Sequence, residues 1–349
     1  MGSLFAYSGL TTKVKAMQGK LLSYNDYVEM AGLLSVSEVV NYLKSKPGYE
    51  KVFAGVNPNE VHRGTLERML DISKFMDFAK IYNFSAVKQR RYLDLYFLRD
   101  ETVMVKKALR NMDNNEDLKA YESLEELFND YSTVNLRKLL TAANIDELLD
   151  VVKNAPYYAN LRYVYDSYAD KTLENKLFDY ELALDMFFFN YIWKKKDKYY
   201  KKDELEAIKK SVGTEIDLLN IMWMYRAKKS YNLDENTIHS YLIPIHYKLT
   251  ADQIKDFARA DANEFMKMFE SSYYGKMYKQ LKTDSTSFNS LFNKALDKVM
   301  FQMQKEDPYS LSTVISYLHF KEREVKHIIT ITECVRYKYP ADEIIKQIV

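Results

Sequence analysis

The sequence predicts an all-α protein built from three similar helical bundles. Glycine and proline are scarce, at 9 and 6 residues in 349, and no glycine occurs between Gly64 and Gly213. Asn-Gly and Asp-Gly hairpin turns do not occur in the sequence, and few runs alternate apolar with polar residues. Long segments rich in Leu, Glu, Lys, Met and Ala instead carry apolar residues at helical spacing. These observations favour helix along the whole chain.

A short capped helix recurs three times. Its N-caps are Ser35, Asn144 and Asp261, and a glutamate follows each of them three residues later. The oxygen of an N-cap accepts the free N–H of the third helical residue, and a glutamate there can reach back to the cap's own N–H. Apolar residues then stand at the first, second, fourth and fifth positions after each glutamate, which forms one apolar stripe. The three glutamates are Glu38, Glu147 and Glu264, which lie 109 and 117 residues apart.

The end of the capped helix also recurs. Pro47 and Pro156 stand nine residues after the glutamate in the first two copies, with Tyr49 and Tyr158 two residues further on. A proline cannot continue the helical hydrogen-bond ladder. The third copy has a tyrosine in the place of the proline and Gly275 two residues later, so we expect a glycine to end that helix.

A second set of helices is predicted to begin with an acidic residue and to end with an arginine. The segments are DETVMVKKALR, ending at Arg110, EIDLLNIMWMYR, running from Glu215 to Arg226, and EVKHIITITECVR, running from Glu324 to Arg336. The arginines lie 116 and 110 residues apart, in phase with the capped helices. The helix dipole favours acids at helix starts and cations at helix ends in any protein, so this pattern is weaker than the first. Each arginine is either a buried ion-pair anchor or a contact for a partner, and we favour the anchor.

Together the two patterns predict three helical units of about 115 residues each. We expect the units to span residues 1–115, 116–236 and 237–349, with boundaries in the segments Asn111–Ala120 and Asn232–Thr237. Units of this size have hydrophobic cores of their own. Three similar units are expected to adopt a rough pseudo-threefold arrangement.

The bulk properties exclude several classes of protein. The net charge is only +2, which disfavours a protein that neutralises many phosphates of a nucleic acid. A single cysteine, Cys334, permits no internal disulfide and fits a reducing cytosol. The N-terminus has no apolar signal-peptide core, and the longest apolar stretch, at residues 182–193, is too short to span a bilayer. We therefore expect a protein that is neither secreted nor integral to a membrane.

The sequence contains no recognisable catalytic, metal or cofactor motif. None of the five histidines forms an HxxxH or HExxH pair, and neither a glycine-rich phosphate loop nor a GxSxG elbow is present. His319 and His327 are interpreted as surface or packing residues, and Cys334 as a small buried hydrophobe. We expect no enzyme activity and no cofactor.

The strongest local charge feature is the segment Trp193–Lys210, with the sequence WKKKDKYYKKDELEAIKK. It could contact anionic lipid headgroups, an acidic protein, or RNA through its tyrosines. The favoured interpretation is a solvated helix face on which four acidic residues balance the lysines. A helical adaptor that binds nucleic acid or anionic lipid through this segment is the alternative hypothesis for function.

The chain resembles the C subunit of V-type and archaeal-type ATPases, which is called the d subunit in eukaryotes. The N-terminal segment from Tyr7 to Phe53 is similar to the family's opening of a basic and apolar helix, a Leu-Leu pair and a short helix that closes on a proline and a tyrosine. EIDLLNIMWMYRAKK and REVKHIITITECVRYK resemble its repeated helix of acid, apolar residues, Asn-Leu and Arg. Asn220 takes the asparagine place approximately, His327 or a neighbour stands there in the third copy, and the first copy is more distant.

The resemblance implies a non-catalytic rotor subunit, present once per complex, whose three helical domains form a funnel. One end receives the D and F shaft subunits, and the other sits on the ring of membrane proteolipids (c or K), so membrane contact is made through the ring. The protein passes torque for ATP-driven ion transport or ATP synthesis on the cytoplasmic, inner face of the cell membrane. It needs no cofactor and no nucleic acid. The residues at matching motif positions, expected in an interface or the framework near the shaft socket, are Arg110, Arg226, Arg336, Glu215 and Glu324.

Overall fold

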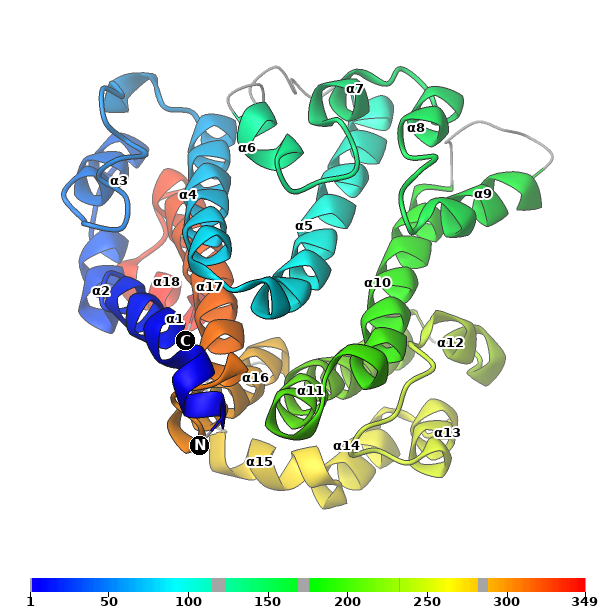
Figure 1. Cartoon of the computed structure of the whole chain (residues 1–349). Coiled ribbons are helices and arrows are strands. Elements are labelled where there is room, and N and C mark those ends of the chain that lie inside the picture. Colours follow the sequence, from blue (N-terminus) through cyan, green and yellow to red (C-terminus); the bar gives the residue numbers. More distant parts are fainter. Residues whose placement is uncertain (1, 115–123, 169–175, 232, 282–287, 349) are drawn as a thin grey trace. The chain divides into compact units, whose positions relative to one another are not determined.

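The computed structural model describes residues 2–114, 124–168, 176–231, 233–281 and 288–348. Helices make up most of these ranges, and none of the residues in them forms a strand (Figure 1). The all-α fold class predicted from the sequence is therefore confirmed. In chain order the helices are α1 (Gly2–Gln18), α2 (Tyr24–Ala31), α3 (Val36–Lys44), η1 (Pro58–Glu60), α4 (Arg63–Phe84), α5 (Val87–Asn114), α6 (Glu125–Asn129), α7 (Leu136–Thr141), α8 (Ile145–Val151), α9 (Tyr158–Ser167), α10 (Leu177–Tyr199), α11 (Lys202–Arg226), the π-helical turn η3 (Ala227–Tyr231), α12 (Glu235–Tyr241), α13 (Ala251–Arg259), α14 (Ala262–Ser271), α15 (Tyr273–Leu281), α16 (Phe288–Glu306), α17 (Leu311–Arg336) and α18 (Ala341–Ile348).

Contacts divide the chain into two compact units. The first unit combines Met1–Lys74 with Tyr200–Val349, and the second is Phe75–Tyr199. The predicted boundary between residues 115 and 116 lies outside the described residues, and the one between residues 236 and 237 falls inside α12. The division into three sequence units therefore stays a prediction.

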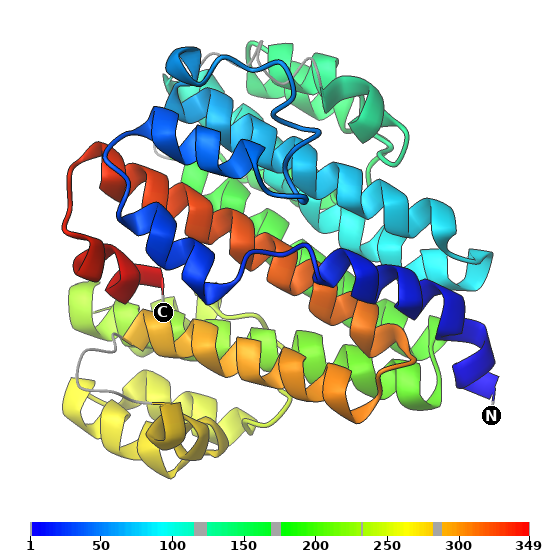
Figure 2. The same cartoon turned by 90° about the vertical axis from the view of Figure 1, so that its left-hand side faces the viewer.

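Helix α17 is the centre of the first unit. It packs against α1, α2, α3, α11, α16 and α18, and it lies between the N-terminal helices and α16 in Figure 2. One hydrophobic core joins side chains from residues 30–70 with side chains from residues 325–348. The first and last parts of the chain are thus stabilised by the same buried surface.

The second unit is built around α5, which packs against α7 and α10, while α10 also packs against α9. At its centre five aromatic rings lie with centroids 5.2 to 5.9 Å apart in edge-on or tilted pairs, the geometry that ring quadrupoles favour. These rings belong to Phe75, Phe78, Phe97, Phe128 and Tyr131. They fasten α4 to α5 and to the short helix α6.

The predicted N-caps of α3, α8 and α14 are confirmed. Ser35, Asn144 and Asp261 each accept a hydrogen bond from the N–H of the glutamate three residues later, at 3.2, 2.9 and 2.9 Å. The return bond from the glutamate to the N–H of the cap occurs only at Asp261. Glu38 and Glu147 instead accept from the N–H one residue before the cap, at 2.9 Å each.

The prediction that Gly275 ends the third capped helix is wrong. Helix α14 ends at Ser271, and Gly275 lies inside α15. A Cβ atom at this position would lie 1.9 Å from the carbonyl oxygen of Phe269 and 2.6 Å from the backbone of Glu270. The glycine is therefore needed because α15 turns back closely against the end of α14.

The predicted acidic helix starts are also wrong. Helices α5, α11 and α17 each begin 13 residues before the predicted start, so Asp100, Glu215 and Glu324 lie well inside long helices. An acid at that depth gains little from the helix dipole, whose effect falls off within the first turn. Arg226 and Arg336 do end their helices, whereas α5 continues for four residues beyond Arg110.

Replacing Gly275 by alanine is expected to lower the free energy of unfolding by about 2 kcal/mol, because backbone atoms must move to admit the new methyl group. Denaturant unfolding followed by circular dichroism measures the change. Gly19→Ala is the control, since its nearest non-local atom would lie 3.8 Å from the added Cβ. Equal stabilities of the two variants would contradict the close approach of α15 to α14.

Candidate functional site

Each of the three long helices α5, α11 and α17 buries one carboxylate near its middle. Glu101, Asp217 and Glu324 have relative exposures of 2%, 0% and 2%, and we call them the carboxylate nodes. A buried carboxylate is costly unless hydrogen bonds replace its hydration shell. Each node therefore shows which chain segments the long helix holds in place.

Asp217 on α11 has the most complete set of partners. Its Oδ1 accepts from the N–H of Tyr247 at 3.1 Å, and its Oδ2 accepts from the N–H groups of Lys248 and Leu249 at 2.6 and 3.2 Å. The hydroxyl of Tyr274 donates to the same Oδ2 at 2.9 Å. The node thus fixes the segment that leads into α13 and the first turn of α15.

Glu324 on α17 joins the two ends of the chain. Its Oε2 accepts from the N–H of Leu22, just before α2, and its Oε1 accepts from the hydroxyl of Tyr49 at 2.6 Å. Lys321, which is itself 2% exposed, donates to Oε1 at 3.0 Å and stands 4.1 Å from the centre of the Tyr49 ring. This buried ion pair supplies the countercharge that the other two nodes lack among their hydrogen-bond partners.

Glu101 on α5 holds the segment before α7. Its Oε2 accepts from the hydroxyl of Ser132 and from the N–H of Thr133, the latter at 3.2 Å. The buried hydroxyl of Tyr157 lies near Glu101, although neither this hydroxyl nor Glu101 Oε1 has a hydrogen-bond partner of good geometry. Glu101 is therefore the least saturated of the three nodes.

The three nodes have one pattern in common. Each binds the segment that enters a pair of short capped helices, and a fully buried tyrosine that follows the pair lies beside the same carboxylate. The pairs are α2 and α3, α7 and α8, and α13 and α14. Helices α5 and α11 hold the pair that comes after them in the chain, while α17 holds the pair at the beginning.

Burial controls the protonation of these groups. It raises the pKa of the Glu101 and Asp217 carboxyls, and their hydrogen bonds act in the opposite direction. It also raises the pKa of Tyr157 and Tyr274, and the neighbouring carboxylate raises each further. The tyrosines therefore remain hydrogen-bond donors, which is the role that a buried carboxylate requires of its neighbours.

The structure separates the residues that the sequence grouped together. Glu324 forms a node, but the half-buried Glu215 does not, because Asp217 two residues later takes that place. None of the hydrogen bonds to the nodes comes from Arg110, Arg226 or Arg336.

The arginines are exposed, so the buried position expected of them is not found. Arg110 binds both oxygens of Glu181, at 2.5 and 3.0 Å, with half of its side chain exposed. Arg336 lies 3.9 Å from Glu333, also half exposed. Exposed pairs of this kind contribute about 1 kcal/mol or less to stability.

Sequence reasoning missed Glu101 and Asp217 as sites, and one signal was available. Tyr49, Tyr157 and Tyr274 stand 11, 10 and 10 residues after the glutamates of the capped helices. A tyrosine at a repeated position implies a repeated partner for its hydroxyl.

The charged segment Trp193–Lys210 is divided between the end of α10 and the start of α11. Lys196 is 5% exposed and lies 2.7 Å from Asp197. Lys209 pairs with Glu206 at 2.9 Å, and Lys210 pairs with Glu306 at 2.7 Å. These ion pairs favour the interpretation of balanced helix faces.

Other candidates for chemistry behave as packing groups. His319 hydrogen-bonds to Asp297 at 2.6 Å, and Cys334 is buried, which raises the pKa of its thiol. A search of the described residues finds no group of three His, Cys, Asp or Glu side chains placed to hold a metal ion. Nor does any helix in the described ranges combine the length and the apolar character needed to cross a membrane.

Comparison with known proteins gives one consistent result. The model of the family described as "ATP synthase (C/AC39) subunit" matches residues 10–347. The C subunit of the A-type ATP synthase from Methanosphaera stadtmanae is 26% identical over 353 aligned positions, which cover 97% of this chain and 87% of that protein. The proteins of the same name from Methanobrevibacter smithii and Halorubrum lacusprofundi are 23% and 24% identical; the alignments cover 99% and 97% of this chain and 88% and 96% of theirs.

Replacing Asp217 by asparagine is expected to lower the free energy of unfolding by about 3 kcal/mol, because an amide NH₂ would face buried N–H donors. Tyr274→Phe removes only one donor and is expected to cost about 1 kcal/mol. Asp256→Asn, on an exposed face of α13, is the matched control. Urea unfolding measures all three, and equal effects of Asp217→Asn and Asp256→Asn would contradict the role of the node.

Glu101 is expected to make stability depend on pH in a defined direction. Its pKa in the folded state is raised above the ordinary value of 4.5, so the folded protein binds this proton more tightly than the unfolded chain does. The stabilisation is complete below that value and is lost as the pH rises through the folded-state pKa. The stability of wild type minus that of Glu101→Gln should therefore fall as the pH rises above 4.5.

Urea unfolding of both proteins across this pH range measures the difference. Glu50→Gln, an exposed position, controls for the loss of one negative charge. A difference between wild type and Glu101→Gln that grows with pH would show that hydrogen bonding, and not burial, dominates at Glu101.

Proposed function

The chain belongs to the ATP synthase C/AC39 subunit family, and from this membership we propose that it is a non-catalytic central-stalk component of an A/V-type rotary ATPase. It connects the D and F shaft subunits to the ring of membrane proteolipids and passes torque between them. One copy serves each complex, on the inner face of the cell membrane, and contact with the membrane is made through the ring. The observation that carries the proposal is the family match across residues 10–347.

The carboxylate nodes support this role on physical grounds. A connector that transmits torque must resist deformation, so its loops and short helices have to be fixed to its long helices. Asp217 and Glu324 do this with four and three hydrogen bonds from buried or half-buried donors. Such fully bonded buried networks are stiff because every alternative arrangement leaves a polar group unpaired.

We further propose that the three sequence units, residues 1–115, 116–236 and 237–349, form a funnel with pseudo-threefold symmetry. The support is the recurrence of a long helix, a node and a pair of capped helices. Glu324 binds Leu22 and Tyr49, so in this arrangement the third unit completes the first. The ring of repeats is thus closed by the two ends of the chain.

The exposed arginines are proposed as partner contacts. Arg226 and Arg336 end α11 and α17, and Arg110 lies near the end of α5. A cation at a helix end is free of helical packing and can meet an acidic group of a partner. Glu215 joins them as a half-buried neighbour, whereas Glu324 belongs to the internal framework.

The first test is affinity capture of the tagged protein from gently solubilised native membranes, with mass spectrometry of the co-eluting proteins. We expect the A and B catalytic subunits, the D and F shaft subunits and the proteolipid to be retained after a high-salt wash. Elution of the protein alone, or with nucleic acid that is released by salt, would contradict the proposal and favour the alternative adaptor function.

Charge reversal tests the arginines. Arg226→Glu and Arg336→Glu are each expected to weaken binding of the purified D and F subunits about tenfold, which corresponds to about 1.4 kcal/mol. Lys51→Glu makes the same change at another exposed position of the same unit and serves as the control. Calorimetry measures the affinities, and unchanged binding in both arginine variants would remove these residues from the interface.

A further inference from the structure

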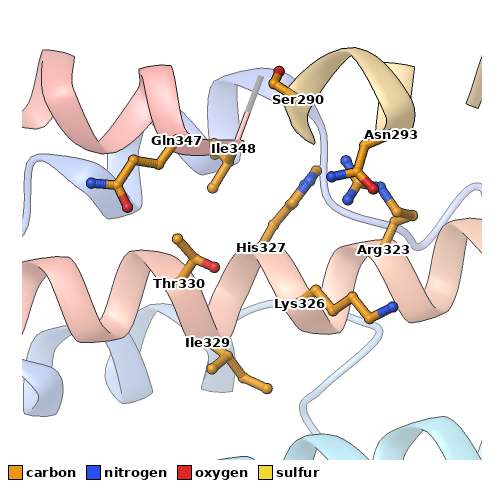
Figure 3. Close-up of a pocket in the computed structure, with 9 residues that line it drawn as sticks. All are labelled: Ser290, Asn293, Arg323, Lys326, His327, Ile329, Thr330, Gln347 and Ile348. Carbon is orange, nitrogen blue, oxygen red and sulfur yellow. The ribbon is translucent and has the colours of Figure 1, made fainter. Parts of the chain in front are cut away.

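A pocket of about 370 Å³ lies among helices α16, α17 and α18 of the first unit (Figure 3). Its polar lining comes from Asn293 on α16, from Arg323, Lys326, His327 and Thr330 on α17, and from Gln347 on α18. No carboxylate is among the lining residues. The pocket shares no residue with the three nodes, and it goes beyond the function proposed above.

The pocket contains polar atoms that lack partners. Both ring nitrogens of His327 and the Nε of Arg323 are buried, and none of these three atoms makes a hydrogen bond. A neutral imidazole has one donor and one acceptor, and buried groups of this kind are nearly always satisfied in native proteins. In Figure 3 the side chains of His327 and Arg323 extend toward Asn293. These atoms therefore mark the place of a missing polar ligand.

The equivalent position on another long helix shows what a filled site looks like. Asn220 follows the node Asp217 by three residues, as His327 follows the node Glu324. Asn220 is fully buried, and its amide both donates to and accepts from the backbone of Ile243, at 2.9 Å in each direction. On α17 no backbone segment occupies this place, so His327 faces the pocket instead.

The charges around the pocket select the class of ligand. Arg323 lies 3.4 Å from Asp297, which also accepts from His319, and Lys326 binds Glu322 at 2.8 Å. Both acids lie outside the lining, so an incoming group meets a guanidinium, an ammonium, an imidazole, a hydroxyl and two amides. Donors predominate in this set, and oxyanions are the ligands that such donors bind best.

We propose that the pocket among α16, α17 and α18 binds a phosphate-type oxyanion, held by Arg323 and His327. The volume exceeds that of a single phosphate, so either a free phosphate with its water or the phosphate of a lipid headgroup fits the same donors. Thr330 and Asn293 supply the neutral contacts.

The titration of His327 reports the binding. Burial lowers its pKa to about 4, and Arg323 and Lys326 lower it further while Asp297 opposes them. Tyr27, which meets the ring edge-on at 5.2 Å, is the aromatic neighbour. An anion beside the ring stabilises the imidazolium, so binding must raise this pKa.

The test uses the full chain with isotope-labelled histidine, observed by NMR, and inorganic phosphate added against chloride at equal ionic strength. We expect saturable shifts of the His327 signals and a rise of its pKa by at least about one unit, with no change at the exposed His246. Arg323→Gln should weaken phosphate binding at least tenfold. His327→Gln should also weaken it, while His246→Gln should not.

A second arm separates the two sources of the ligand. Vesicles of phosphatidylglycerol are compared with vesicles of phosphatidylcholine, using the His327 signals of the same protein. Shifts with free phosphate support a soluble ligand, and shifts only with the anionic vesicles support a headgroup. Absence of any shift overturns the proposal, as does a phosphate response that survives Arg323→Gln. If Arg323→Gln fails to fold by circular dichroism, binding that persists in His327→Gln overturns it instead.

Discussion

The buried carboxylate in the middle of each long helix is the constraint on which the rest of the structure depends. Once Asp217 is fully removed from water, nearby segments must present donors to it, and three consecutive backbone N–H groups and a tyrosine do so. This requirement fixes the path of the loop before α13 and the position of α15. Glu101 and Glu324 impose the same requirement elsewhere in the chain.

The node at Glu324 has the widest structural effect, because its partners come from the opposite end of the sequence. Leu22 and Tyr49 are joined to α17, and the hydrophobic core around them includes residues up to Ile348. The first unit is therefore closed by its two termini. For a protein that carries torque, such closure removes the free end at which a helical array would otherwise begin to unfold.

The sequence predicted what depends on local interactions. The all-α class and the N-caps Ser35, Asn144 and Asp261 follow from nearest-neighbour chemistry, and the structure confirms them. The nodes were missed because an acid inside a helix and an acid at its start look alike when no glycine or proline marks the boundary. Gly213 did not mark one either, since it lies inside α11 where a Cβ would meet the ring of Tyr247 at 2.5 Å. The pocket at His327 depends on three helices that are remote in sequence, so no local pattern reveals it.

Amide hydrogen exchange tests the central claim most directly, because it reports on single N–H groups in the intact protein. The N–H groups of Leu22, Thr133 and Lys248 lie outside the helices, yet each donates to a node. If the nodes hold these segments, the three amides exchange as slowly as the core amides of the long helices to which they are bound, through opening of the whole unit. Exchange at the rate of ordinary exposed loops would show that the carboxylates do not hold these segments, and would contradict the structural role assigned to the nodes.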